Sequence, residues 1–215
     1  MTYLEIVNKV LKRLRESEVT TVGQTAYSSL IGEFVNDVKR EVEDAWNWSA
    51  LRTTFTVSTT ANLFNYVFTD AGTRIRVLDV WDDTNNYQLQ ERSTKWFNKN
   101  FQSASGLPTP SKPSYYNFNG VNSNGDIQVD LYPIPDGAYD LRFNIIAPQD
   151  DLSADTDVIT VPSALVIEGA VSRAMSERGA DGGNMDAEMR YRQRLADYIA
   201  IDAGFRTDEL TWNWN

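Results

Sequence analysis

The sequence predicts an α+β fold: two terminal helix pairs form a four-helix bundle, with an inserted antiparallel β domain and an extended C-terminal tail. Three observations predict it. Apolar residues recur at helical spacing near both ends, alternating β-branched and aromatic segments fill the middle, and turn pairs such as Asn124-Gly125 separate those segments. Because most of the expected strands follow one another with no helix between them, parallel crossovers are not expected.

Residues 1–50 are expected to form the first helix pair. Thr2 and Glu5 have the spacing of a capping box, which marks the start of a helix. The second helix is expected from about Tyr27 to Trp46, and its solvent side carries two i,i+4 pairs, Lys39 with Glu43 and Arg40 with Asp44. The two helices are amphipathic, with apolar stripes at Leu4, Val7, Leu11 and Leu14 and at Leu30, Ile31, Phe34, Val38, Val42 and Ala45.

Residues 51–157 are expected to form the β domain. Its composition shifts to β-branched and aromatic residues, with a proline-rich loop over 106–113 and an acidic linker over 150–157. A short helix is expected at 94–101. Alternation predicts strands at 52–59, 62–68, 74–81, 87–89, 115–118, 127–132 and 139–146.

Residues 158–206 are expected to complete the bundle. Pro162 suits the first helical turn and Gly179 ends that helix, while the last helix contains Met185 and Met189 and ends near Gly204. Residues 207–215 form a C-terminal extension. There Leu210, Trp212 and Trp214 occupy alternate positions, which share one side of an extended segment. They are expected either to fold back on this chain or to enter a groove of a partner.

Composition narrows the possible functions. None of the 215 residues is Cys or His, which excludes disulfides, thiol nucleophiles, Ser-His catalysis and most transition-metal sites. Thirty acidic and 20 basic residues give a net charge of −10, unlike a generic nucleic-acid binder. That charge suits a surface past which DNA slides, but on charge alone solubility is the favoured explanation. No membrane span or secretory signal is expected, so assembly is expected in a cytoplasm.

The remaining candidate sites are weak, and no catalytic, cofactor-binding or metal-ligating residue is predicted. Asp126 and Asp130 share a strand face, but four residues place their backbones roughly 13 Å apart, too far for a glycosidase pair. The segments 122–126 and 155–157 carry calcium-type oxygens without the full loop pattern. Trp81, Tyr87 and Trp96 are candidates for a carbohydrate platform or for core packing. The triplet Arg190, Arg192 and Arg194 fits either a solvated helix paired with Asp186 and Glu188 or a partner contact.

Three segments resemble the head-to-tail adaptors of short-tailed phages, of the tail tubular protein A type. They are 41–49 (EVEDAWNWS), 113–116 (PSYY) with 127–136 (IQVDLYPIPD) and 139–143 (YDLRF), and 161–170 (VPSALVIEGA). Together with the helix–sheet–helix order, the resemblance covers nearly the whole chain. It implies a non-enzymatic virion protein that needs no cofactor.

The resemblance also implies the partners. The chain would form a dodecameric ring with copies of itself, bind the portal protein on one side and the tail nozzle or tube protein on the other, and let genomic DNA pass without sequence-specific binding. It would sit in the neck of the virion after assembly in the host cytoplasm. Related adaptors send a C-terminal extension into the portal, which favours portal binding by Leu210, Trp212 and Trp214. Two alternatives stay open, a carbohydrate-binding tail component and a tail terminator protein.

Overall fold

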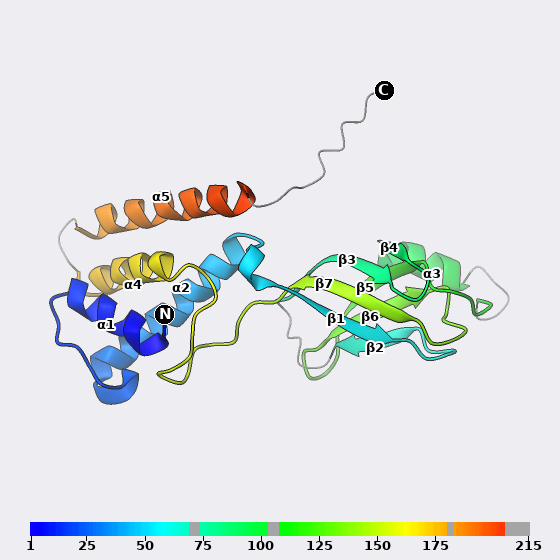
Figure 1. Cartoon of the computed structure of the whole chain (residues 1–215), viewed down its shortest axis with the longest axis horizontal. Coiled ribbons are helices and arrows are strands. Elements are labelled where there is room, and N and C mark those ends of the chain that lie inside the picture. The colour runs from blue at the N-terminus through cyan, green and yellow to red at the C-terminus, as the bar shows by residue number, and fades with distance from the viewer. Residues whose placement is uncertain (69–73, 103–107, 180–182, 205–215) are drawn as a thin grey trace, which may run out of the picture. The chain divides into compact units, whose positions relative to one another are not determined.

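The computed structural model describes residues 1–68, 74–102, 108–179 and 183–204, which fall into two units (Figure 1). The helical unit comprises Met1–Leu51 and Pro148–Asn215, and the β unit comprises Arg52–Ala147. Each unit buries apolar side chains of its own.

The helical unit contains α1 (Tyr3–Arg13), α2 (Ala26–Ala45), α4 (Ser163–Glu177) and α5 (Gly183–Gly204). Capping residues define where three of these helices begin or end. Thr2 and Glu5 form the expected capping box at α1, and Thr25 caps α2 by accepting a hydrogen bond from the Ser28 amide at 2.9 Å. Beyond the end of α4, Gly179 has a φ of +63°, the left-handed conformation that commonly follows a helix C-cap.

α4 is the central helix of this unit. In Figure 1 it lies between α5 on one side and α1 and α2 on the other, and it packs against all three. A side chain at Gly169 would clash, because a Cβ there would lie 2.5 Å from Cγ1 of Val38 on α2 and 3.1 Å from Cε2 of Tyr191 on α5. Glycine therefore lets both helices approach α4 closely at one point. The buried apolar residues of α4 are Leu165, Val166, Ile167, Ala170, Val171 and Ala174.

A polar clamp joins α2 to the segment that enters the helical unit from residue 148. Nζ of Lys39 lies 3.2 Å from Oε1 of Glu43 and donates to the Gln149 carbonyl at 2.6 Å. The same Glu43 oxygen accepts from the Gln149 amide at 3.2 Å, and Asn36 bonds both backbone groups of Leu152. Lys39 and Glu43 are fully buried. The prediction that this pair faces solvent is therefore wrong, because the segment after residue 148 covers it.

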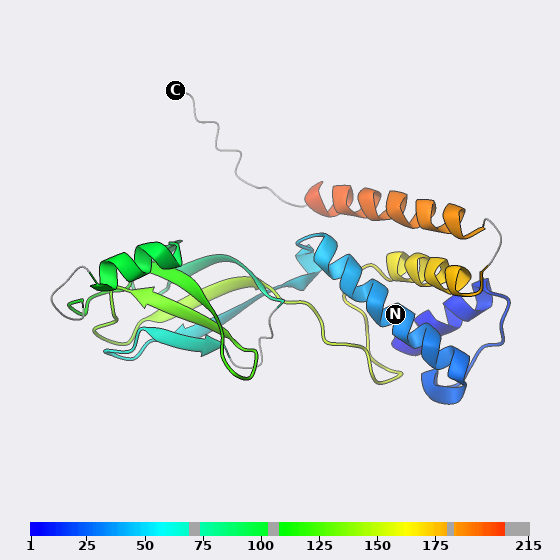
Figure 2. The same cartoon turned by 180° about the vertical axis from the view of Figure 1, so that it is seen from behind.

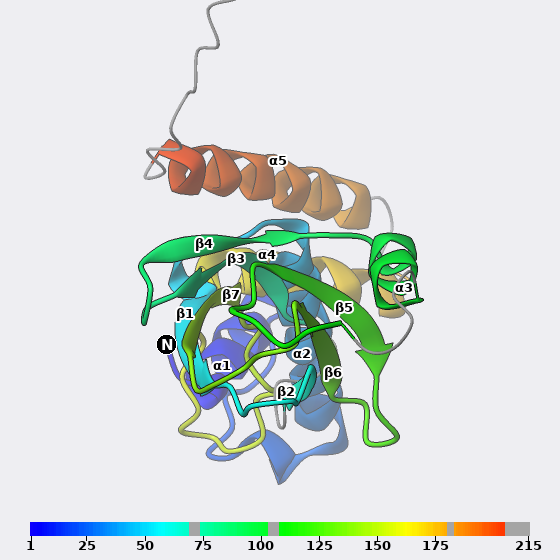
Figure 3. The ribbon, with the colours of Figure 1, turned by 90° about the vertical axis from the view of Figure 1, so that its right-hand side faces the viewer.

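The β unit is one seven-stranded sheet, in the order β1-β7-β3-β4-β5-β6-β2, that curls into a half-barrel (Figure 3). The curl brings the two edge strands together through their side chains. The ring centroids of Phe55 on β1 and Phe68 on β2 are 4.8 Å apart, and both rings also pack on Phe143 of β7. The strands are β1 (Arg52–Ser58), β2 (Asn65–Phe68), β3 (Arg76–Asp82), β4 (Tyr87–Glu91), β5 (Tyr115–Val121), β6 (Ile127–Tyr132) and β7 (Asp140–Ile146).

A fifth helix, α3 (Thr94–Gln102), belongs to the β unit and covers β5 and β6 from outside (Figure 2). Trp96 packs on Tyr115 and Tyr132, with ring centroids 4.9 and 5.2 Å apart, and Phe97 is buried. The chain segment that contains α3 also connects β4 to β5, which pair in parallel. A parallel pair needs such a crossover.

These findings correct the predicted fold class. The chain is α+β, but it is not a four-helix bundle of terminal pairs with an inserted antiparallel domain. The described residues contain five α-helices and a mixed sheet, and α5 packs chiefly on α4 instead of completing a bundle with α1 and α2. α5 approaches α4 at Gly169, where the absence of a side chain leaves room for the Tyr191 ring. The predicted tail, 207–215, lies outside the described residues, and the division into domains at residues 51 and 157 stays a prediction.

Candidate interaction surface

α5 is attached to the helical unit by one narrow buried stripe. Ala187 and Tyr191 are 2 % and 3 % exposed, and both face the rest of the unit. Burial raises the pKa of the Tyr191 hydroxyl, and the nearby Glu41 carboxylate raises it further, so the ring stays neutral. Ser172 of α4 bonds Glu188 at 3.1 Å. Most of the remaining surface of this 22-residue helix is exposed.

The C-terminal end of α5 is held by one carboxylate. Asp202, only 9 % exposed, accepts from the indole Nε1 of Trp46 at 3.0 Å and from the Ser49 hydroxyl at 2.5 Å. Trp48 donates its own indole N–H to the Val42 carbonyl at 2.6 Å. The Trp-rich junction that the sequence shows at 46–48 therefore connects the end of α2 to the end of α5. This contact holds the C-terminal end of α5, which is the last part of the chain that the structure describes, against the end of α2.

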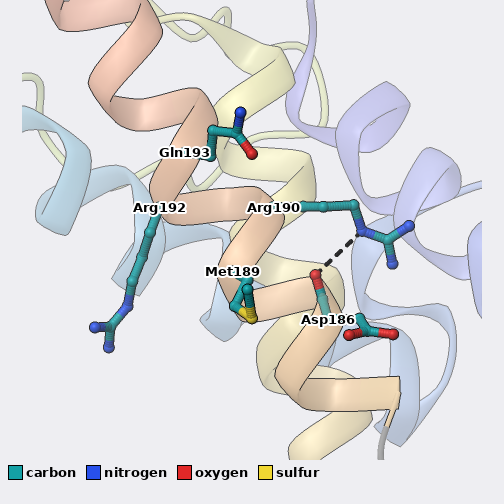
Figure 4. Close-up of a pocket in the computed structure, with 5 residues that line it drawn as sticks. All are labelled: Asp186, Met189, Arg190, Arg192 and Gln193. Carbon is teal, nitrogen blue, oxygen red and sulfur yellow. Dashed lines mark hydrogen bonds between the residues drawn. The ribbon is translucent and has the colours of Figure 1, made fainter.

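The outer face of α5 presents two exposed methionines. Met185 and Met189, one turn apart, are 70 % and 67 % exposed. A groove of about 480 Å³ lies on one side of Met189, lined by Asp186, Arg190, Arg192 and Gln193 as well (Figure 4). A second groove, of about 460 Å³, lies between this ridge and the end of α4 at Ser176. Unbranched, polarisable methionine side chains adapt to the shape of a partner, and this arrangement suits protein binding.

The three arginines of α5 divide between two sides of the helix, with Arg192 on one side and Arg190 and Arg194 on the other. Arg192 pairs with Glu188 at 2.7 Å, as the sequence spacing predicts. Arg190 points to the opposite side (Figure 4) and donates its Nε–H to the Asp186 carbonyl, not to the predicted carboxylate. Arg194 lies 3.0 Å from Glu168 of α4, a partner that the spacing within α5 could not reveal.

The weak polar candidates from the sequence already accept hydrogen bonds from other groups of this chain. Asp130, on β6, accepts from Nδ2 of Asn65 at 2.7 Å, while Asp126 accepts from Nδ2 of Asn122 within its own turn at 3.0 Å. Asp155 accepts from the Val22 amide, and Asp157 accepts from the amides of residues 153 and 154. In the part of the chain that the structure describes, no three carboxylates gather as metal ligands.

The proposed carbohydrate platform is not assembled. Tyr87 packs against the core on the inner face of the sheet. Trp81 neighbours the buried Val80 on β3, so its side chain lies on the opposite, outer face. Trp96 packs under α3 against Tyr115. Leu210, Trp212 and Trp214 lie outside the described residues. Among the described helices, none combines the length and the apolar run required to cross a bilayer.

The exposed methionine ridge and the helix end anchored through Asp202 give α5 a surface that suits binding to another protein. The chain belongs to the SU10 adaptor protein family, whose model matches residues 1–212. The predicted resemblance to phage head-to-tail adaptors is thereby confirmed, and the chain is a phage adaptor protein of a structural family. No curated protein matches the chain.

Proposed function

We propose that this chain is a subunit of an adaptor ring, a dodecamer, in the neck of the virion, where it links the portal to the tail nozzle or tube. The match of the adaptor family over residues 1–212 is the observation that carries this proposal. The ring would be assembled in the host cytoplasm and would enclose the channel through which DNA leaves. The net charge of −10 supports that role, because an acidic wall repels phosphates and lets DNA pass without specific binding.

The C-terminal tail is the proposed portal anchor. Leu210, Trp212 and Trp214 share one side of an extended segment, and tryptophan is among the residues most often found as an interface anchor. α5 ends at Gly204, and the contact of Asp202 with Trp46 holds that end of the helix in place. All subunits of a ring would therefore present their tails from equivalent positions. Repeated around the ring, such anchors act together and multiply the strength of attachment.

Co-purification with portal protein tests the proposal. The double variant Trp212→Ala/Trp214→Ala is expected to lose portal binding, since each anchor commonly contributes about 2 kcal/mol or more. The matched control Thr211→Ala/Asn213→Ala changes the opposite side of the same segment and should bind as the unmodified chain does. Truncation after Thr207 should abolish binding with little change in melting temperature.

Two outcomes would contradict the proposal. Co-purification of the full chain with tail-tube protein but never with portal would instead indicate a tail terminator. A truncated chain that melts many degrees lower and still binds portal would mean that the tryptophans cover this chain's own core.

A further inference from the structure

Two clusters of opposite charge occupy different sides of the helical unit. On one side, Glu168 of α4 lies 2.8 Å from Arg13 of α1 and 3.0 Å from Arg194 of α5. Arg190 is one turn before Arg194 and shares its face, next to Asp186 (Figure 4). Three guanidiniums thus lie around two carboxylates. We call this the basic flank: Arg13, Arg190 and Arg194, around Glu168 and Asp186.

The other side has the inverse arrangement. Arg173 of α4 bonds Asp37 at 3.1 Å and Glu41 at 2.8 Å on α2. Arg40 bonds Asp37 at 3.3 Å and also Asp151. The pKa of Arg40 is raised chiefly by its hydrogen bond to Asp151, with a smaller contribution from Glu33. Four carboxylates thus surround two guanidiniums. We call this the acidic flank: Glu33, Asp37, Glu41 and Asp151, around Arg40 and Arg173.

The two flanks cannot neutralise each other within one chain. Glu168 and Arg173, at their centres, are five residues apart on α4, which places them about 140° apart around the helix. The basic flank has more cations than carboxylates, and the acidic flank has more carboxylates than cations. A second copy of the chain therefore offers to each flank a surface of opposite charge.

Apolar groups accompany both flanks. Met189 and Met185 are exposed beside Arg190 on α5. On α2, Phe34 lies one turn from Asp37 and Val38 and remains half-buried, although it belongs to the apolar stripe of that helix. Exposed ion pairs contribute little each, so a stable contact needs an apolar component as well. Methionine on an aromatic ring is a favourable pair.

We propose that the basic flank and methionine ridge of one copy dock on the acidic flank and Phe34 of the next copy. This contact joins two different surfaces and is therefore heterologous, the type that closes into a ring or continues as a filament. Only closure into a ring rests on the proposed adaptor function; the pairing of flanks stands on the contacts above. Screening by salt should weaken it, because its specificity is electrostatic.

Disulfide trapping tests the contact, since the natural sequence contains no cysteine. Two single variants, Met189→Cys and Phe34→Cys, are mixed as full-length chains, free and bound to portal, and oxidised. We expect a covalent dimer from the mixture and not from Met189→Cys alone. Asn98→Cys, on α3 of the β unit, is the control for random collisions. Adding Arg190→Glu/Arg194→Glu to the Met189→Cys chain should lower the dimer yield about tenfold, whereas Lys95→Glu/Lys99→Glu, the same charge change on α3, should not.

A charge swap provides the second measurement. The change Glu33→Lys/Glu41→Lys is added to the Phe34→Cys chain. The dimer yield with the Met189→Cys chain should then fall. It should recover when the Met189→Cys chain also carries Arg190→Glu/Arg194→Glu. Efficient dimers of Met189→Cys with itself would overturn the inference, because they indicate a symmetric contact. So would a mixture without dimer in both the free and the portal-bound state. In that last case, retained portal co-purification would leave the adaptor function standing while this contact is rejected.

Discussion

Different kinds of contact stabilise the inside of the helical unit and the inside of the β unit. In the helical unit, segments far apart in sequence meet through buried polar groups: Lys39 and Glu43 receive the backbone of Gln149, and Asp202 receives Trp46. In the β unit, the two edge strands meet through the edge-to-face contact of Phe55 with Phe68, and both rings pack on Phe143. Polar clamps are directional and tolerate the loss of one partner poorly, whereas an aromatic cluster loses stability in proportion to the volume removed.

The largest expected effect breaks the polar clamp on one side. Lys39→Met leaves the Glu43 carboxylate buried without its cation, which should lower the free energy of unfolding by about 3–5 kcal/mol. The double variant Lys39→Met/Glu43→Leu removes both charges and should recover much of that loss. Urea denaturation followed by far-UV circular dichroism measures both. A single variant as stable as the unmodified chain would show that solvent reaches this pair.

The corresponding change in the β unit is Phe143→Ala. Its ring is 2 % exposed and packs on Phe55 and Phe68, so truncation should cost about 3 kcal/mol, at the low end for a buried phenylalanine because Phe55 is only half-buried and can relax. The exposed neighbour Thr56→Ala is the control and should change stability little.

Hydrogen exchange sharpens the comparison between these two variants. If the units are separate folding domains, Lys39→Met should reduce amide protection only within Met1–Leu51 and after Pro148, and Phe143→Ala only within Arg52–Ala147. Loss of protection in both units from either change would show that they unfold together.

The elements with local signals were predictable, and those that depend on distant segments were not. The capping residues Thr2 and Glu5 and the helix stop at Gly179 are where the sequence places them, because such signals act over a few residues. The pair Lys39 and Glu43 has the same i,i+4 spacing as a solvent-exposed pair, and only the segment at Gln149, 110 residues after Lys39, decides that it is buried. The parallel β4–β5 pairing likewise depends on a crossover that the short pattern at 94–101 does not specify.

The candidate interaction surface was predictable only in part. Arg190, Arg192 and Arg194 stand out in the sequence, and the Glu188–Arg192 pair follows from spacing. The bridging role of Glu168 does not, since its partners Arg13 and Arg194 come from two other helices. Met185 and Met189 fit an apolar stripe as well as an exposed ridge. Their exposure follows from the narrow contact of α5 through Ala187 and Tyr191.

A smaller effect is expected from a single cap in the helical unit. Thr25→Ala removes the acceptor of the Ser28 amide at the start of α2 and should cost about 1 kcal/mol in urea denaturation. Thr21→Ala is a matched control, because Thr21 precedes a short 3₁₀ turn without a side-chain capping bond. Equal losses from the two variants would contradict a specific capping role for Thr25.

The smallest expected effect is a pH dependence confined to the β unit. Burial raises the pKa of the Asp130 carboxyl above its ordinary value, and bonds from Asn65 and Asn119 offset this only in part. The folded β unit therefore holds this proton up to a higher pH than the unfolded chain, whose aspartates titrate near about 3.9. As pH rises through the window between these two pKa values, folding must bury a charge that the unfolded chain carries in water, so stability falls.

Asp130→Asn isolates that contribution, because the amide oxygen can still accept from Asn65 while the charge is gone. Other carboxyl groups titrate in both chains, so the informative quantity is the difference in unfolding free energy between the variant and the unmodified chain. That difference should grow in favour of Asp130→Asn as pH rises through the window and then level off. Urea midpoints of the β unit across a pH series measure it. A difference that moves the other way would mean that the two asparagine donors outweigh burial. The hydrogen-bonded side chains of Asn65 on β2, Asp130 on β6 and Asn119 on β5 would then resemble the polar clamp of the helical unit more than the aromatic core.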